Sequence, residues 1–223
     1  MSSDERGIFR QAPGDERLST AVISDSLDSL GLRHQVVQTT LTALCVGSRA
    51  FGRASTARFE PTDVDPAEGP YEDAIAFIDA LVEGDVAVLA TGANYSTAYW
   101  GELFSAAALG RRAVGMITDG PIRDTPKIMQ LGFACFSATH RPIDFRARMR
   151  IVAAHQRVEL GGVAIDHGDL VLADDDGVVV IPKTVEAHVL ERARARTSSE
   201  SAVLVDLRGG ATLRAVWDRH HVL

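Results

Sequence analysis

The amino-acid sequence predicts an α/β fold in layers, a single compact domain that ends in helices. Between Tyr71 and Thr118 an amphipathic stretch, an apolar run, a second helical stretch and a second apolar run follow one another. This order favours parallel strands covered by helices. From Arg150 onward, short apolar runs alternate with glycine- and aspartate-rich turns, which indicates antiparallel or mixed pairing. The 223 residues contain no linker long enough to separate two domains.

The first half of the chain opens with a polar leader, residues 1–18, and the single domain is expected to cover residues 19–223. A helix is predicted over 20–31, because Ser19 or Thr20 can cap its start and Gly31 can end it. Alternation between glycines predicts strands near 44–46 and 54–59. Apolar residues at helical spacing predict an amphipathic helix over 71–82, with Ile75, Ile78 and Leu81 on its buried face.

The second half is expected to continue the same alternation. Asp85–Ala90 and 114–118 are short apolar runs of the kind found in buried strands, and a helix is expected between them over 98–109. Three short strands are predicted near 158–160, 170–173 and 178–181. Two C-terminal helices are predicted over 183–196 and 202–219, the second broken at Gly209-Gly210.

Composition narrows the class of protein. Thirty acidic against 23 basic side chains give a formal net charge of −7, which argues against a nucleic-acid partner. The N-terminus has no apolar signal segment, and no apolar run approaches the roughly 20 residues of a membrane span. Cys45 and Cys135 lie in apolar stretches, as buried reduced thiols do. We therefore expect a cytoplasmic protein with no membrane contact.

Two segments that follow predicted strands carry the residues best suited to chemistry. One runs from Gly92 to Leu103 and the other from Asp119 to Asp124. Ligands of open α/β sheets collect beyond the carboxyl ends of the strands, so both segments are expected to face one cleft. The predicted helix start would leave the backbone N–H groups of Gly101, Glu102 and Leu103 free to bind a substrate carboxylate.

Arg123 and Asp124 are the central candidates. A guanidinium can grip a carboxylate or an enolate oxygen with its planar fork. One aspartate can hold a hard cation that keeps several waters, which suits Mg²⁺ and also Mn²⁺, and Glu102 adds a second carboxylate. The alternative from the residue types alone is a turn with a surface ion pair.

Five segments together resemble one known family. They are STAVISDSLDSLG at 19–31, GDVAVLATG at 84–92, WGELFSAAALG at 100–110, GMITDGPIRD at 115–124 and GDLVLADDDGVVVIP at 168–182. In this order they are similar to the RraA-like family. It includes aldolases acting on 4-hydroxy-4-methyl-2-oxoglutarate and 4-carboxy-4-hydroxy-2-oxoadipate, which also decarboxylate oxaloacetate. The resemblance implies a fold akin to the swivelling phosphohistidine domain and a homo-oligomer, trimer or hexamer, with sites between subunits.

The resemblance also implies roles for particular residues. In the aldolases an acidic residue, twenty intervening residues and an Arg-Asp pair form the catalytic motif, which Glu102, Arg123 and Asp124 match. Asp124 would be the metal ligand, and Arg123 would bind the keto oxygen of a small 2-oxo acid. Aldol cleavage also needs a base for the C4 hydroxyl, and Glu102, directly or through a metal-bound water, is the candidate. The chain departs from the motif at Lys127, where the aldolases have an acidic residue. Glu200 is the candidate for a glutamate supplied by a neighbouring subunit.

The resemblance leaves two functions open. One is a metal-dependent lyase that cleaves 4-hydroxy-2-oxo acids to pyruvate, decarboxylates oxaloacetate, or both. The other is a regulator that binds RNase E without catalysis, as the name-giving branch of the family does. The intact set of Glu102, Arg123 and Asp124 favours the lyase, whereas Lys127 weakens it. The apolar faces of the predicted C-terminal helices lead us to expect threefold assembly.

Overall fold

The computed structural model describes residues 9–64, 69 and 71–221. Residues 1–8 of the expected leader therefore lie outside the described residues, as do parts of the expected loop at 61–70. The helices are η1 (Asp15–Arg17), α1 (Thr20–Asp28), α2 (Glu72–Asp79), α3 (Glu102–Gly110), α4 (Thr125–Leu131), α5 (Glu186–Arg208) and α6 (Leu213–His220). The strands are β1 (Thr42–Ala43), β2 (Ala50–Pro61), β3 (Asp85–Ala90), β4 (Gly115–Ile122), β5 (Cys135–His140), β6 (Met149–Ala154), β7 (Val158–Leu160), β8 (Val163–Ile165), β9 (Leu170–Asp174) and β10 (Gly177–Ile181).

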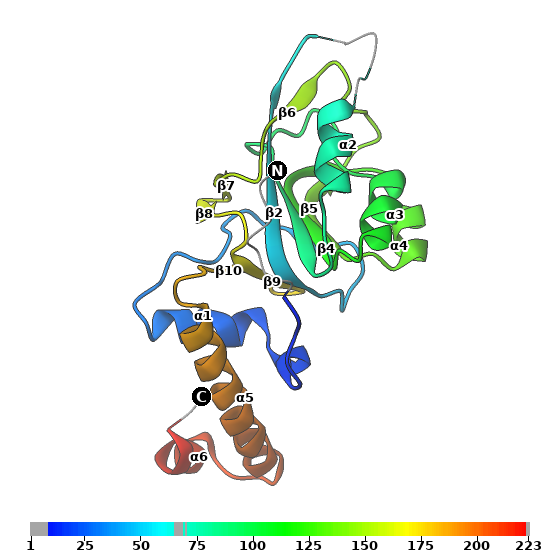
Figure 1. The fold of residues 1–223 in the computed structure, drawn as a ribbon. Helices are drawn as coiled ribbons and strands as arrows, with labels where there is room; N and C mark the ends of the chain where they lie inside the picture. The colour runs from blue at the N-terminus through cyan, green and yellow to red at the C-terminus, as the bar shows by residue number, and fades with distance from the viewer. Residues whose placement is uncertain (1–8, 65–68, 70, 222–223) are drawn as a thin grey trace.

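The predicted mixed α/β class is confirmed. One sheet has the order β1-β5-β4-β3-β2-β9-β10, with β6 also paired to β2, and it curls into a nearly closed barrel. Strands β2 to β5 pair in parallel, while β9, β10 and β6 pair in antiparallel fashion. Figure 1 shows α2, α3 and α4 beside the parallel strands, and α5 and α6 extending away from the sheet near α1.

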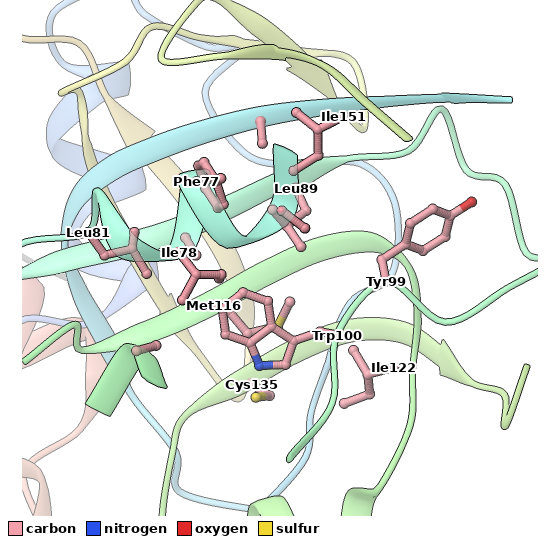
Figure 2. Packing of buried hydrophobic residues seen from close by; sticks show 14 of the residues in the cluster. Phe77, Ile78, Leu81, Leu89, Tyr99, Trp100, Met116, Ile122, Cys135 and Ile151 are labelled. Carbon is pink, nitrogen blue, oxygen red and sulfur yellow. The ribbon is translucent and has the colours of Figure 1, made fainter. Parts of the chain in front are cut away.

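Strand β3 is apolar from Val86 to Ala90 and is buried on both faces. Val86 and Val88 face a cluster that includes Ile117 and Phe136, whereas Leu89 faces the cluster under the helices. A strand buried on both faces has no polar side to alternate with its apolar side. In Figure 2, side chains from α2 lie over the strands close to Leu89 and Met116. The buried face of α2 includes Phe77 as well as the predicted Ile78, while Ile75 is exposed; Leu81 is buried just beyond the end of the helix.

The described part of the leader packs against the rest of the chain. The rings of Phe9 and Phe51 meet edge to face with centroids 4.8 Å apart. Asp15 is fully buried and accepts two hydrogen bonds from Arg194 of α5, at 2.7 and 3.0 Å. Helix α1 begins as predicted, with the Ser19 side chain accepting a hydrogen bond from the Val22 amide. The N-terminal segment and α5 are thus joined to each other.

Four sequence predictions need correction. Residues 44–46 form a turn rather than a strand, with Val46 almost fully exposed and Cys45 only half-buried. The helix predicted from residue 98 begins at Glu102, because Ala98 and Trp100 lie extended and pair with Asp144 and Ile122. The strand predicted over 114–118 is longer than expected, because β4 continues through Asp119 to Ile122. The C-terminal helices, predicted over 183–196 and 202–219, are instead a long α5 that runs to Arg208 and a short α6 that begins at Leu213.

Helix α5 continues past residue 196, its predicted end, for a local physical reason. The polar run between Arg196 and Ala202 suggested a break, but the Thr197, Ser198, Ser199 and Ser201 hydroxyls each bond a carbonyl four residues earlier and stay within the helix. The break falls at Gly209-Gly210, where it was predicted. Helix α4 and strands β5, β6 and β8 lie in segments for which no element was predicted. Within the described residues, no helix is long and apolar enough to cross a membrane.

Candidate functional site

The site lies where β3 and β4 end. Register between β4 and β5 shifts after Thr118, so Asp119 and Gly120 form an irregularity that redirects the strand. The buried Asp119 carboxylate accepts hydrogen bonds from the Thr91 amide (2.7 Å), the Thr91 hydroxyl (2.9 Å) and the Ala93 amide (2.8 Å). Asp119 therefore fixes the loop that follows β3, and the two segments singled out in the sequence do meet.

Gly101 brings these two segments into close contact. The Arg123 amide donates to the Trp100 carbonyl at 2.9 Å, immediately before α3 begins. A Cβ atom at Gly101 would lie 2.7 Å from Asp124 Oδ2 and 3.2 Å from Arg123 Cγ. A side chain at position 101 would therefore displace the Asp124 carboxylate from its present position. The Glu102 and Leu103 amides lie in the first turn of α3 and therefore have no acceptor within the helix. The Glu102 amide donates instead to Asp124 Oδ2.

Arg123 and Asp124 lie next to this helix start. Asp124 takes a left-handed backbone conformation (φ 59°), which aspartate tolerates better than most residues, and it precedes α4. Its Oδ2 lies 3.7 Å from Arg123 Nε and 3.4 Å from the Glu102 amide nitrogen. The two side chains are 37% and 40% exposed, so a small ligand can reach both.

Arg123 is held by two residues that the sequence analysis missed. Its Nη2 lies 3.3 Å from Asp144 Oδ2, and the Tyr71 hydroxyl donates to the same oxygen at 2.7 Å. Burial alone would raise the pKa of Asp144, but hydrogen bonds from Tyr71 and the Arg146 amide, with the charge of Arg123, hold that pKa below its ordinary value. Burial and the bond to Asp144 raise the pKa of Tyr71, so its hydroxyl stays protonated. Tyr71, Asp144 and Arg123 form no recognisable motif in the sequence, so the first two could not be identified from it.

Glu102 and Lys127 form an ion pair between α3 and α4. Lys127 Nζ lies 2.7 Å from Glu102 Oε2. The hydrogen bond to Glu102 and its negative charge raise the pKa of Lys127, so the amine stays protonated and is a poor nucleophile. Glu102, Arg123 and Asp124 are therefore neighbours, with a lysine beside the proposed base.

Glu200 lies elsewhere in the chain. It sits within α5 and pairs with Arg196 at 2.9 Å, and Arg196 also reaches Asp25 of α1 at 2.7 Å. Figure 1 shows α5 at the end of the molecule away from α3 and α4. Glu200 can therefore serve a site of this kind only across a subunit boundary, and that role stays a prediction.

Two hollows flank Arg123 and Asp124. One, of about 360 Å³, extends from Gly101 and Leu103 toward Tyr71, Phe104 and Phe145. The other, of about 330 Å³, is lined by Thr125, His140 and Arg141 together with Ile122, Pro126 and Pro142. The site thus has an apolar side and a more polar side of mixed lining.

A metal at this site would have few protein ligands. Within the described part of the chain, no group of three or more His, Cys, Asp and Glu side chains is placed to hold an ion. Asp124 offers one accessible carboxylate, and the carboxylate of Glu102 is paired with Lys127. This donor set fits a hard cation that keeps most of its water, such as Mg²⁺, and does not fit zinc.

The fold and the site define a small α/β protein with an arginine and a carboxylate at a helix N-terminus. The RraA-like family model, described as Aldolase/RraA, matches residues 20–180. The chain therefore belongs to the RraA-like family, and the resemblance read from the sequence is confirmed.

Individual relatives agree with this membership. A protein of Halalkalibacterium halodurans named "Putative 4-hydroxy-4-methyl-2-oxoglutarate aldolase" is 30% identical over 83% of this chain and 82% of its own length. Protein DlpA of Legionella pneumophila is 25% identical over 87% of this chain, which spans only 31% of DlpA. Streptomyces coelicolor RraAS2, described as an unusual member of the RNase ES inhibitor RraA protein family, has 27% identity and a TM-score of 0.75, covering 86% and 97% of the two chains. The likeness to the phosphohistidine domain stays a prediction.

Proposed function

We propose that this protein is a divalent-metal-dependent carbon–carbon lyase for 2-oxo acids. It would cleave 4-hydroxy-2-oxo acids to pyruvate, decarboxylate oxaloacetate, or both. The observation that carries the proposal is the placement of Arg123 and Asp124 against the N-terminus of α3, with Glu102 on the first turn of that helix. The name of the Halalkalibacterium relative supports the same class of reaction.

The chain offers a separate group for each part of a 2-oxo acid. The backbone amides at the start of α3, from Gly101 to Leu103, suit the C1 carboxylate, which would replace Asp124 as the acceptor of the Glu102 amide. The Arg123 guanidinium suits the C2 oxygen, because it is held in place by Asp144. Asp124 would hold Mg²⁺, or Mn²⁺, which when bound would act as a Lewis acid toward the carbonyl.

Both reactions place negative charge on the C2 oxygen. Breaking the C3–C4 bond, or losing the C4 carboxylate of oxaloacetate as CO₂, leaves its electron pair in a pyruvate enolate. Arg123 donates hydrogen bonds to that oxyanion, and such fixed donors often supply the largest catalytic contribution. A proton then adds to C3 and gives pyruvate.

Only aldol cleavage needs a base at C4. As the C3–C4 bond breaks, the C4 hydroxyl loses its proton and becomes a carbonyl, and Glu102 would accept that proton. Glu102 is free to do so only after it exchanges its bond with Lys127 for one to the substrate hydroxyl. Decarboxylation has no such step.

The direct test measures pyruvate release with a coupled lactate dehydrogenase assay. The substrates are oxaloacetate and a panel of 4-hydroxy-2-oxo acids, each with Mg²⁺, with Mn²⁺ and with a chelator. We expect metal-dependent release above the uncatalysed rate. Absence of release from every substrate with either metal would contradict the proposal.

The assembly and the second candidate function are linked to one surface. Leu204, Val205, Leu213 and Trp217 expose apolar side chains on α5 and α6. We propose that these helices contact neighbouring copies in a homo-oligomer, trimer or hexamer, which would also bring Glu200 near another subunit's site. A regulator of the kind that the Streptomyces relative's description names would instead use such a surface to bind an RNase. Sedimentation equilibrium that gave a monomer at micromolar concentration would favour the second candidate.

A further inference from the structure

The hollow on the apolar side of Arg123 is built almost entirely from hydrocarbon. Its walls include Tyr71 and Ile75 from the α2 region, Trp100 and Phe104 around the start of α3, and Phe145. Among the residues that the structure describes, Arg123 and Asp124 are the only charged ones that line it. Its volume, about 360 Å³, falls within the range of roughly 300–1,000 Å³ that is usual for small-molecule sites.

The aromatic wall is fixed by packing within the chain. Phe145 is 7% exposed and meets Tyr71 edge to face, with ring centroids 5.5 Å apart. Trp100 is buried, and its indole N–H donates to the Ser105 hydroxyl at 2.8 Å. Figure 2 shows Trp100 beside Met116 and Cys135, well inside the core. The hollow is therefore preformed and requires little ordering when a ligand enters.

A second carboxylate would find no unpaired cation among the described residues that line this hollow. The Tyr71 hydroxyl already donates to Asp144, and Arg123 already pairs with Asp144 while facing the position of the reacting oxygen. A charged tail placed against Ile75 and Phe104 would lose its hydration without gaining a cation. An alkyl or aromatic tail would instead remove apolar surface of both partners from water.

We infer that the preferred substrate is a 2-oxo acid with an apolar tail, alkyl or phenyl, that lies in this hollow while the 2-oxo acid head faces Arg123 and Asp124. The inference rests on the proposed function for the position of the head. It adds a substrate class that neither the motif nor the names of the relatives give. The polar hollow beside His140 and Arg141 would be left to solvent or to the leaving group.

Binding of unreactive analogues separates this inference from catalysis. Calorimetry in Mg²⁺ buffer would compare pyruvate, 2-oxohexanoate, phenylpyruvate and 2-oxoglutarate, which share the head and differ in the tail. Full burial is worth about fourfold in affinity per methylene, so 2-oxohexanoate should bind at least about tenfold more tightly than pyruvate. Phenylpyruvate should do likewise, and 2-oxoglutarate should gain nothing.

A matched pair of variants tests where the tail lies. Ile75 lines the hollow and Met129 on α4 does not, and the two are 47% and 49% exposed. Ile75→Asp should lower the ratio of phenylpyruvate affinity to pyruvate affinity by about tenfold. Met129→Asp should change neither affinity.

Several outcomes would overturn the inference. Tighter binding of 2-oxoglutarate than of phenylpyruvate would assign the tail to the polar hollow. A change of oligomeric state in Ile75→Asp, with no change in the ratio of affinities, would assign the apolar wall to a contact between copies of the chain. Lyase activity without a tail preference would refute this inference alone, whereas binding with the expected preference and no lyase activity would refute only the proposed reaction.

Discussion

Two arginine–aspartate pairs at opposite ends of the molecule have similar chemistry and different surroundings. Arg194 and Asp15 join α5 to the N-terminal segment, at 2.7 Å, with the Asp15 side chain fully buried. Arg123 and Asp144 lie beyond the carboxyl end of β4, with Arg123 Nη2 3.3 Å from Asp144 Oδ2 and both side chains partly exposed. In the first pair only Arg194 is accessible, at 43% exposed, because Asp15 is buried. In the second pair both side chains are accessible, at 37% and 28% exposed. Burial of the carboxylate and the neighbouring groups, rather than the residue types, separate a structural pair from a functional one.

The largest expected effect concerns Asp124, which borders the accessible pair. Asp124→Ala should abolish metal-dependent turnover, because it removes the one carboxylate proposed to hold the cation. Asp124→Asn should do nearly the same, and it keeps a residue that tolerates the left-handed backbone at this position. Thermal unfolding should change little in the Asn variant. Unchanged metal affinity in both variants, measured by calorimetry, would show that the ligand lies elsewhere.

The second-largest expected effect distinguishes Glu102 from Arg123, which are proposed to act on different atoms of the substrate. Glu102→Gln keeps size and hydrogen-bonding reach but removes basicity, so aldol cleavage should fall by about 10² to 10⁴. Oxaloacetate decarboxylation should fall much less. Arg123→Lys should lower both reactions, since an ammonium cannot reproduce the planar fork of the guanidinium. Steady-state rates for both substrates decide the matter, and an equal loss in Glu102→Gln would mean that Glu102 orders the metal's waters instead.

How much the sequence could predict differs between these regions. The apolar runs of β3 and β4 and the motif residues beyond them could be found because each lies within a short, continuous segment. Asp144 and Tyr71 could not, because they are 73 residues apart and meet only in the folded chain. The same holds for the buried Asp15, whose partner Arg194 lies 179 residues away in a helix that looks solvent-exposed in sequence.

Element boundaries failed where tertiary contacts override local preference. Tyr99 and Trp100 belong to a helix-like stretch of sequence, yet the Tyr99 amide bonds the Pro121 carbonyl at 2.9 Å and both rings are buried in the core. These contacts hold the segment extended as far as Gly101. The start of α3, and with it the position of its first-turn amides, therefore depends on β4 and could not be read from local sequence.

A smaller effect, on stability alone, is expected at the buried pair. Asp15→Asn keeps the shape but replaces a charged hydrogen-bond acceptor of Arg194, which should lower the free energy of unfolding by about 1–3 kcal/mol. Turnover should not change. The matched control is Asp218→Asn on α6, whose exposed pairing with Arg214 should be worth less than about 1 kcal/mol. Urea titrations of the three proteins provide the comparison.

The pH dependence of this loss follows from the Asp15 pKa. Burial alone would raise that pKa, but the hydrogen bonds from Arg194 and the Ala12 amide, with the charges of Arg194 and Arg49, hold it below the ordinary value. A carboxyl with a depressed pKa in the folded state stabilises the protein above its unfolded pKa and loses that contribution as pH falls through the folded one. The difference between Asp15→Asn and the parent should therefore be full at pH 7 and shrink below about pH 4. A difference that is constant down to pH 2 would mean that the charge is not responsible.

The smallest expected effect tests whether Tyr71 positions the accessible pair. Tyr71→Phe removes the hydroxyl that donates to Asp144 and keeps the ring that packs against Phe145. One such hydrogen bond has a net value of about 0.5–1.5 kcal/mol, so kcat should fall by about two- to twelvefold as Arg123 loses a fixed partner. Because the Tyr71 bond lowers the pKa of Asp144, its loss should raise that pKa. The acid limb of the kcat/KM profile should therefore move to higher pH, which a purely structural role for Tyr71 would not produce.

The control is Tyr95→Phe, a change at an exposed tyrosine of the loop after β3, which should alter neither kcat nor the acid limb. If Tyr71→Phe also left the acid limb in place, Arg123 would owe its position to Asp144 and the backbone alone, and Tyr71 would serve only as part of the apolar wall.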